Sequence, residues 1–194
     1  MNPEKKENGP EVKIVPATSE DARGVAEVYY KTWLATYPNE RTGVTTEDVE
    51  DRFKDAFTEE SLAKRAERIS QLKENEPLFL AKDGDRIIGL CGVIRHPDKN
   101  QLKTIYVLPE YQGRGIGTLL WEEAKKYFDV SKDTIVQVAT FNANAIAFYK
   151  KLGFEETGKE IQDEKFRMKS GVVIPETEMI IRAKGGQANE PVKT

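Results

Sequence analysis

The sequence has few residues of the kinds that form disulfides and metal sites, since it holds one cysteine and one histidine among 194 residues. Because Cys91 is alone, no disulfide can form within the chain. The run around it, IIGLCGVI, is the longest apolar stretch and is far too short to span a membrane. We therefore expect Cys91 to be a buried thiol in a strand, and we expect neither a metal cofactor nor a membrane partner.

The chain also lacks a marked excess of charge of either sign. Thirty basic residues against 33 acidic residues leave a net charge of −3, which gives no general attraction to nucleic acid. The amino-terminal MNPEKKENGP is not followed by an apolar segment of the kind found in secretory signals. We therefore expect a cytoplasmic protein that does not bind nucleic acid.

No linker rich in glycine, proline or serine divides the chain, and no internal repeat is present. The length is that of one ordinary domain, so we expect a single domain over residues 11–183. The polar tails, residues 1–10 and 184–194, are predicted to be disordered.

Hydrophobic periodicity predicts an α/β domain. An amphipathic helix capped by Thr18 or Ser19 is expected to reach Tyr37, and Thr45 and Asp48 are spaced as a capping box. A later helix is expected to turn six side chains inward: Ile116, Leu119, Leu120, Ala124, Tyr127 and Phe128. The strands are predicted at residues 12–15, 77–81, 86–94, 102–108, 134–140, 154–161 and 177–183, with helices within 45–76 and at 143–152.

Three glycines, Gly113, Gly115 and Gly117, precede and open the helix that begins near Ile116. A loop that opens a helix presents unpaired N–H groups, and the helix dipole favours an anion there. The alternative is a flexible connector. There is no Gly-Lys-Ser/Thr of a P-loop, and no G-x-G-x-x-G opens a first β-α-β unit, which leaves a phosphate loop of a third kind.

The segment QGRGIG at residues 112–117, followed by NANAIAFYKKLGF at residues 142–154, resembles the GNAT superfamily of acyl-CoA-dependent N-acetyltransferases. The resemblance implies a GNAT-like fold, with a central, mostly antiparallel sheet, flanking helices and a β-α-β core that binds acetyl-CoA. It also implies donor contacts from two further places: the end of the fourth strand and Asn142, whose alternative or additional role is to cap the last helix. The implied donor-binding residues are Ile105, Tyr106, Val107, Gln112, Gly113, Arg114, Gly115, Ile116, Gly117, Thr118 and Asn142.

Tyr149 is the candidate general acid that the resemblance implies. A tyrosine with a pKa near 10 keeps its proton at neutral pH and can donate it to a departing thiolate. The alternative is a core aromatic on an amphipathic helix. No general base is assigned, because His96 lies in a predicted turn and residues 101–105 contain no carboxylate.

The predicted acceptor is a primary amine of a small molecule or a peptide. The segment 45–76 holds ten acidic and six basic residues, which either attracts a cationic, polyamine-like acceptor or is an ordinary charged helix face. Trp33 and Tyr37 either line the acceptor pocket or pack on the sheet. A non-catalytic CoA-binding module is the alternative function, and a homodimer is a further expectation.

Overall fold

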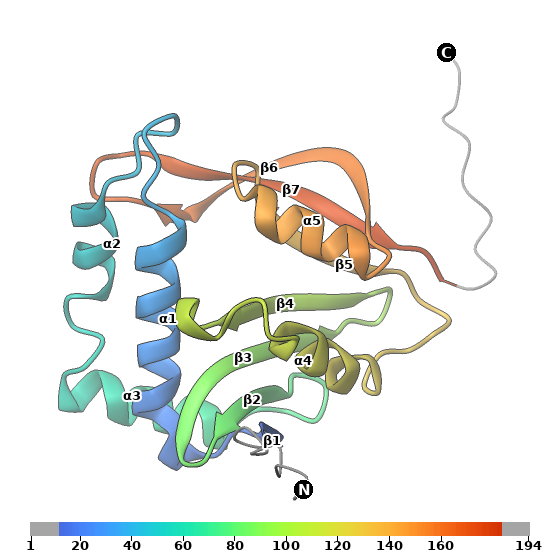
Figure 1. The fold of residues 1–194 in the computed structure, drawn as a ribbon, viewed down its shortest axis with the longest axis horizontal. Coiled ribbons are helices and arrows are strands. Elements are labelled where there is room, and N and C mark those ends of the chain that lie inside the picture. The colour runs from blue at the N-terminus through green and yellow to red at the C-terminus, as the bar shows by residue number, and fades with distance from the viewer. Residues whose placement is uncertain (1–11, 184–194) are drawn as a thin grey trace, which may run out of the picture.

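The computed structural model describes residues 12–183. The two tails that the sequence predicts to be disordered, residues 1–10 and 184–194, lie outside the described residues. The described chain forms a seven-stranded sheet with helices on both of its faces (Figure 1). In chain order the elements are β1 (Lys13–Pro16), η1 (Ser19–Asp21), α1 (Ala22–Thr36), α2 (Thr46–Phe53), α3 (Glu59–Ser70), β2 (Leu78–Asp83), β3 (Arg86–Arg95), β4 (Asn100–Val107), η2 (Pro109–Tyr111), α4 (Ile116–Lys125), β5 (Thr134–Ala139), α5 (Ala143–Lys151), β6 (Glu155–Arg167) and β7 (Val173–Ile181).

The strand order is β1-β2-β3-β4-β5-β7-β6. The pairing of β4 with β5 is parallel, and the other pairings in this sheet are antiparallel. Helix α4 connects β4 to β5, as a parallel pairing requires. The predicted fold class, a mixed and mostly antiparallel sheet with a β-α-β core, is therefore confirmed.

Helices α1 and α4 pack on opposite faces of the sheet, because neighbouring residues of β4 contact different helices. The ring of Tyr106 packs edge-on against Tyr29 of α1, with ring centroids 5.5 Å apart. The adjacent Ile105 faces α4, where its Cγ2 lies 3.9 Å from the position that a Cβ on Gly117 would take. Alternate side chains of a strand point to opposite faces, so the α1 side and the α4 side of the sheet are distinct surfaces.

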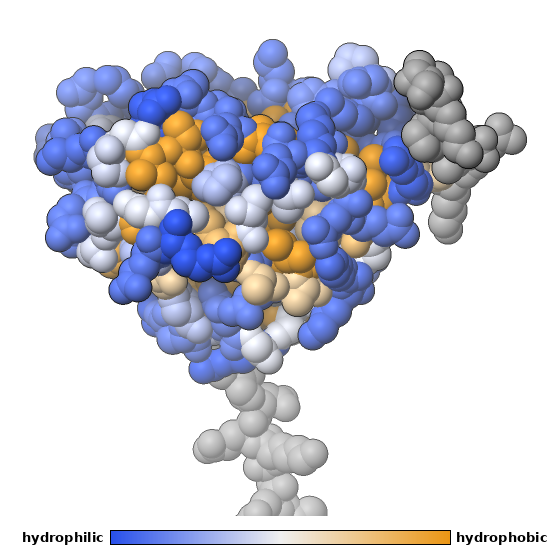
Figure 2. All heavy atoms as spheres, turned by 90° about the horizontal axis from the view of Figure 1, so that it is seen from above, coloured by the Kyte–Doolittle hydropathy of each residue, from blue (hydrophilic) through white to orange (hydrophobic). Residues whose placement is uncertain are grey.

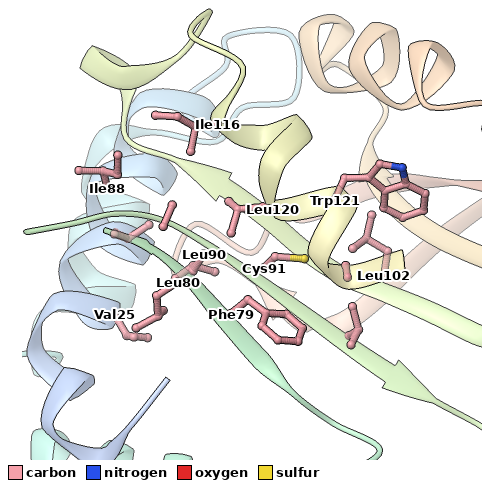
Figure 3. Close-up of a cluster of buried hydrophobic side chains, with 14 of the residues drawn as sticks. Val25, Phe79, Leu80, Ile88, Leu90, Cys91, Leu102, Ile116, Leu120 and Trp121 are labelled. Carbon is pink, nitrogen blue, oxygen red and sulfur yellow. The ribbon is translucent and has the colours of Figure 1, made fainter. Parts of the chain in front are cut away.

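The main core fills both faces of the central strands (Figure 3). Val25 of α1, Leu80 of β2, Leu90 of β3 and Leu120 of α4 are each at most 1% exposed. Cys91 lies among them and is fully buried, as the sequence predicts, and burial raises the pKa of its thiol. Burial of such aliphatic side chains is the main source of stability for this fold.

Two sequence predictions about these elements are wrong. Leu119 is 46% exposed, whereas Trp121, which the prediction omits, is 4% exposed. The buried stripe of α4 runs through Ile116, Leu120, Trp121 and Ala124, and Leu119 lies well off its centre at about 100° per residue. Strand β6 extends to Arg167, beyond the predicted end, because an edge strand exposed on much of both faces need not be apolar.

Charged residues make up 32% of the sequence. Figure 2 shows hydrophilic side chains over most of the outline of one face, with apolar side chains visible between them. Among residues 12–183, no helix has both the length and the apolar character that a membrane span needs.

Candidate active site

A cavity of about 1720 Å³ runs through the sheet and opens toward both α1 and α4. Its walls include Tyr29, Trp33 and Tyr37 from the α1 side, and Gly115 and Gly117 from the start of α4. Pockets for single drug-sized ligands are commonly about 300–1,000 Å³. This cavity is therefore large enough for two substrates that meet inside it.

The cavity passes between β4 and β5, where the two strands separate. Their parallel pairing covers Asn100–Leu102 of β4 and Thr134–Val136 of β5, and it stops there although β4 continues to Val107. The amide of Leu108 donates to the carbonyl of Ile88 on β3. The preceding amide, that of Val107, therefore points to the opposite edge, toward the gap. This edge of β4 is free to pair with an extended ligand.

The loop before α4 presents a row of amides with no protein acceptor. Among the described residues, the N–H groups of residues 113–118 have no hydrogen-bond acceptor. Gly113 and Gly115 have φ angles of +74° and +81°, which disfavour other residues, and a Cβ on either would meet no protein atom within 4 Å. The space in front of these amides is open, and the dipole of α4 makes it favourable for an anion.

Gly117 is favoured for a different reason. A Cβ at this position would lie 3.1 Å from Cζ of Phe148 on α5. The glycine thus allows α4 and α5 to pack closely beside the loop that precedes α4. The guanidinium of Arg114 lies 5.2 Å from the centroid of the Tyr111 ring, and Arg114 is absent from the cavity wall. The other ten donor-binding residues predicted from the sequence all line the cavity.

Two residues of the α5 segment lie at the junction of the two sides. Tyr149 lines the cavity and is 6% exposed, and its hydroxyl has no hydrogen-bond partner within residues 12–183. Burial raises the pKa of this hydroxyl, so Tyr149 is protonated at neutral pH. Asn142 caps α5, since its Oδ1 accepts from the amide of Ala145 at 3.0 Å, and it also lines the cavity. Its capping role is therefore established.

Aromatic side chains form the α1 side of the cavity. The rings of Trp33 and Tyr37 have centroids 4.3 Å apart, and the hydroxyls of Tyr37 and Tyr106 are 3.1 Å apart. Burial raises the pKa of both tyrosines. Trp33 and Tyr37 also belong to a cluster of buried apolar side chains, so each packs in the core and lines the cavity.

Glu176 of β7 is a buried carboxylate in the same cavity wall. It is 8% exposed, and burial raises the pKa of its carboxyl. It pairs across the sheet with Ala139, which packs with Trp33 and Tyr37. Directly paired residues share a face of the sheet, so Glu176 lies on the α1 side.

Buried polar atoms without partners are concentrated in this cavity. Within residues 12–183, five buried side-chain polar atoms have no hydrogen-bond partner, and four of them belong to residues of the cavity wall. These four are Trp33 Nε1, Arg65 Nε, Thr104 Oγ1 and Glu176 Oε2. Burial raises the pKa of Tyr106, but Trp33 and Thr104 lie close enough to its hydroxyl to lower it. The unpaired atoms that favour a polar ligand on the α1 side are therefore those of Arg65 and Glu176.

This arrangement belongs to a chain whose sequence matches the model of a known protein family. The model of the acetyltransferase (GNAT) domain matches residues 33–170, which is most of the chain. The chain belongs to the GNAT acetyltransferase family. The predicted resemblance is thereby confirmed.

Individual relatives of this GNAT chain are distant. An N-acetyltransferase of Methanocaldococcus jannaschii, itself uncharacterised, is 33% identical over 105 residues, which cover 50% of this chain and 46% of that protein. The N-alpha-acetyltransferase RimI of Mycobacterium tuberculosis is 36% identical over 84 residues, which cover 40% of this chain and 51% of that protein. The chain thus spans about half the length of these relatives, or less.

The fold is shared with solved structures. The PaiA N-acetyltransferase of Thermoplasma acidophilum, determined in complex with coenzyme A, superposes with a TM-score of 0.68 and 21% identity. The superposition covers 89% of this chain and 99% of that chain. This likeness supports the GNAT fold.

The structure favours one of the two sequence interpretations of the charged insert, the ordinary helix face. Of its ten acidic residues only Asp55 lines the cavity, whereas four of its six basic residues do: Arg52, Lys64, Arg65 and Arg68. The acidic surplus is therefore an ordinary charged helix face for nearly all of its members. The sequence gives no direct signal of this, because the insert's net charge does not say which side chains face inward.

The structure places Glu176 in the cavity wall and His96 outside it. His96 bonds Gln101 through Nε2 at 3.0 Å and is absent from the cavity wall, in keeping with the interpretation as a turn residue. Sequence reasoning missed Glu176, which stands among 33 acidic residues. The last strand is predicted to begin at residue 177, whereas β7 begins at Val173, so the sequence prediction left Glu176 outside a strand and gave no sign of its burial.

Proposed function

We propose that this GNAT chain transfers an acetyl group from acetyl-CoA to a primary amine of a small molecule or a peptide. One observation carries the proposal: a single cavity joins the amide-lined loop before α4 to a polar, aromatic pocket on the α1 side. The relative from Mycobacterium tuberculosis, named as an N-alpha-acetyltransferase, supports the peptide as one form of acceptor.

The donor end fits a CoA diphosphate. The unpaired amides of residues 113–118 would hold the diphosphate, and the open space in front of Gly113 and Gly115 leaves room for it. The free edge of β4 would hold the pantetheine arm, and the amide of Val107 would donate to the thioester oxygen as it gains charge. When bound, acetyl-CoA supplies the activated acetyl group.

Two side chains would move protons. The ammonium form of a primary amine, with a pKa near 10, must lose a proton before attack, and Glu176 would accept it, directly or through a water. Tyr149, at the junction of the two sides, would donate its proton to the departing sulfur. The base then lies on the acceptor side and the acid lies where donor and acceptor meet, as direct attack requires.

The alternative is a CoA-binding module without catalytic activity. Calorimetry with CoA and a thiol-release assay with acetyl-CoA and a panel of primary amines separate the two. We expect CoA binding and amine-dependent thiol release. CoA binding with no release for any amine would support the module, and absence of CoA binding would contradict both functions.

A further inference from the structure

The charges of α3 are sorted between its two faces. The residues that line the cavity, Ser61, Lys64, Arg65 and Arg68, recur with the three- and four-residue spacing of one helical face. The acidic residues of the same helix, Glu59, Glu60 and Glu67, are absent from the cavity wall. The helix therefore presents a basic face to the cavity, although its segment is acidic overall.

Arg65 is the most enclosed cation of this face. Its Nε is buried and has no hydrogen-bond partner, and its guanidinium lies 5.8 Å from the centroid of the Tyr29 ring. Within residues 12–183 no carboxylate lies within 4 Å of its side-chain nitrogens. Burial lowers the pKa of Arg65, which reflects the cost of desolvating a cation with no counter-ion. An unpaired, partly desolvated guanidinium is a site for an oxyanion.

The rest of the wall adds to this positive charge. Seven basic residues line the cavity against two acidic ones, Asp55 and Glu176. Lys103 of β4 is one of them, and so is Arg52 of α2, whose Nη2 donates to the carbonyl of Lys165 at 3.2 Å. Helices α2 and α3 supply four of the seven: Arg52, Lys64, Arg65 and Arg68. The field beside these helices therefore favours a ligand with negative charge.

The phosphates of the donor would not neutralise Arg65. The loop that would hold the diphosphate opens α4, on one face of the sheet, whereas Arg65 stacks near Tyr29 of α1, on the other face. The counter-ion on the α1 side must then come from the acceptor.

We propose that the acceptor carries an oxyanion, a carboxylate or a phosphate, in addition to its amine, and that Arg65 binds this oxyanion. This inference rests on the proposed function. The acceptor would place its amine toward Glu176 and its anionic group toward α3. It would be an amino acid, an acidic peptide or a phosphorylated amine rather than a polyamine.

The first test compares acceptors that differ in the charge of the tail. γ-Aminobutyrate, butylamine and putrescine share a four-carbon chain, and phosphoethanolamine is compared with ethanolamine for the phosphate form. We expect kcat/KM by thiol release to be at least about 10-fold higher for the better anionic acceptor than for its neutral partner. Since the Debye length falls from about 10 Å at 0.1 M salt to about 3 Å at 1 M, this ratio should shrink at high salt. Equal values, or a preference for putrescine, would overturn the proposal.

The second test assigns the preference to Arg65. Arg65→Gln should lower kcat/KM for the anionic acceptor by about 10- to 100-fold more than it lowers kcat/KM for the neutral acceptor. Arg65→Lys should restore part of the loss, because it keeps the charge but not the fork geometry. Arg23→Gln, on the exposed surface of α1 and outside the cavity wall, is the matched control. A lower acetyl-CoA affinity in Arg65→Gln with an unchanged acceptor preference would assign the cation to the donor and contradict the inference.

A binding measurement keeps this test independent of turnover. Calorimetry of the CoA-saturated protein with the same acceptors should show tighter binding of the anionic ones, and Arg65→Gln should remove the difference. If no amine is acetylated, the proposed function fails while this measurement still decides the anion preference. Equal binding of anionic and neutral amines to a protein that does acetylate them would reject the inference alone.

Discussion

The donor side and the acceptor side of the cavity present different kinds of groups. On the proposed donor side, the backbone would supply the contacts: the amides of residues 113–118 and the free edge of β4. On the acceptor side, side chains supply them, among them Trp33, Arg65 and Glu176. A backbone site can serve one constant ligand in many proteins, whereas a side-chain site can be rebuilt for each acceptor without disturbing the fold.

The largest effect should follow from a change to the backbone site. Gly115→Val should weaken CoA binding by at least about 100-fold, because a Cβ would occupy the open space before α4 and because a φ of +81° strains a β-branched residue. Calorimetry with CoA measures the affinity. Gly158→Val is the control: its φ is +75°, it is also open within 4 Å, and it is absent from the cavity wall. If both variants bind CoA with equal affinity, the amides of this loop do not hold the diphosphate.

The same contrast explains what the sequence could predict. Gly113 and Gly115 are favoured by backbone conformation, and Gly117 by the approach of Phe148, so the proposed donor loop leaves a recognisable sequence pattern. No sequence pattern marks Arg65 or Glu176, because the role of each depends on which face of its helix or strand it occupies. The fold class was also predictable, because it follows from the periodicity of the apolar residues and from the turns between elements. Burial of Trp121 and exposure of Leu119 were not, since they depend on how α4 is rotated against the sheet.

The next largest effect should come from the residue where the two sides meet. Tyr149→Phe should lower kcat by about 10- to 1000-fold with little change in acetyl-CoA affinity, as expected when a positioned proton donor is lost. Because burial raises the pKa of Tyr149, the wild-type protein should show no loss of activity from its deprotonation up to at least pH ~10. Pre-steady-state thiol release measures the chemical step.

A matched control for that variant is Tyr127→Phe. Tyr127 is partly buried in the main core, packs with its ring centroid 4.8 Å from that of Phe79, and is absent from the cavity wall. This variant should keep a normal kcat. A folded Tyr149→Phe protein with the same chemical rate as Tyr127→Phe would reduce Tyr149 to a packing residue.

Glu176→Gln tests whether the acceptor side supplies the base. We expect kcat/KM to fall by about 10- to 100-fold at neutral pH. Because burial raises the pKa of Glu176 above 4.5, the wild-type rate should rise with pH through that raised value, and this acid limb should be absent from the variant. A pH profile of kcat/KM measures both.

Glu176→Gln should make the folded protein more stable, although it lowers the activity. A carboxyl whose pKa is higher in the folded state stabilises the fold when protonated, and this contribution is lost as the pH rises through the raised pKa. At pH 7 the buried charge is therefore a cost, so Glu176→Gln should raise the melting temperature. An unchanged pH profile together with a higher melting temperature would leave Glu176 as a buried charge without a role in proton transfer.

The smallest effect on turnover should follow from a residue that holds the acceptor wall from outside the cavity. Asp48 of α2 accepts from the amide of Ser170 at 2.8 Å and from the Ser170 hydroxyl at 2.8 Å, and it completes the capping box with Thr45. It therefore ties α2, which carries Arg52, to the loop between β6 and β7. Asp48→Asn should lower the free energy of unfolding by about 1–3 kcal/mol, because an amide cannot accept all of these bonds.

The pH dependence of stability tests whether the hydrogen bonds to the Asp48 carboxylate stabilise the fold. Burial alone would raise the pKa of Asp48, but the hydrogen bonds from Thr45 and Ser170 lower it below 3.8. The stabilisation by Asp48 is then fully present above the ordinary pKa of 3.8 and is lost as the pH falls through the lowered pKa. The free energies of unfolding of the wild type and of Asp48→Asn should therefore converge in acid. Urea unfolding at pH 7 and in acid measures this. Glu50→Gln on the same helix, at an exposed position, should change stability by less than about 1 kcal/mol. Asp48→Asn should also raise KM for the acceptor more than KM for acetyl-CoA, because the wall that Asp48 holds belongs to the acceptor side. Equal increases in both KM values would mean that loosening this wall disturbs donor binding as much as acceptor binding.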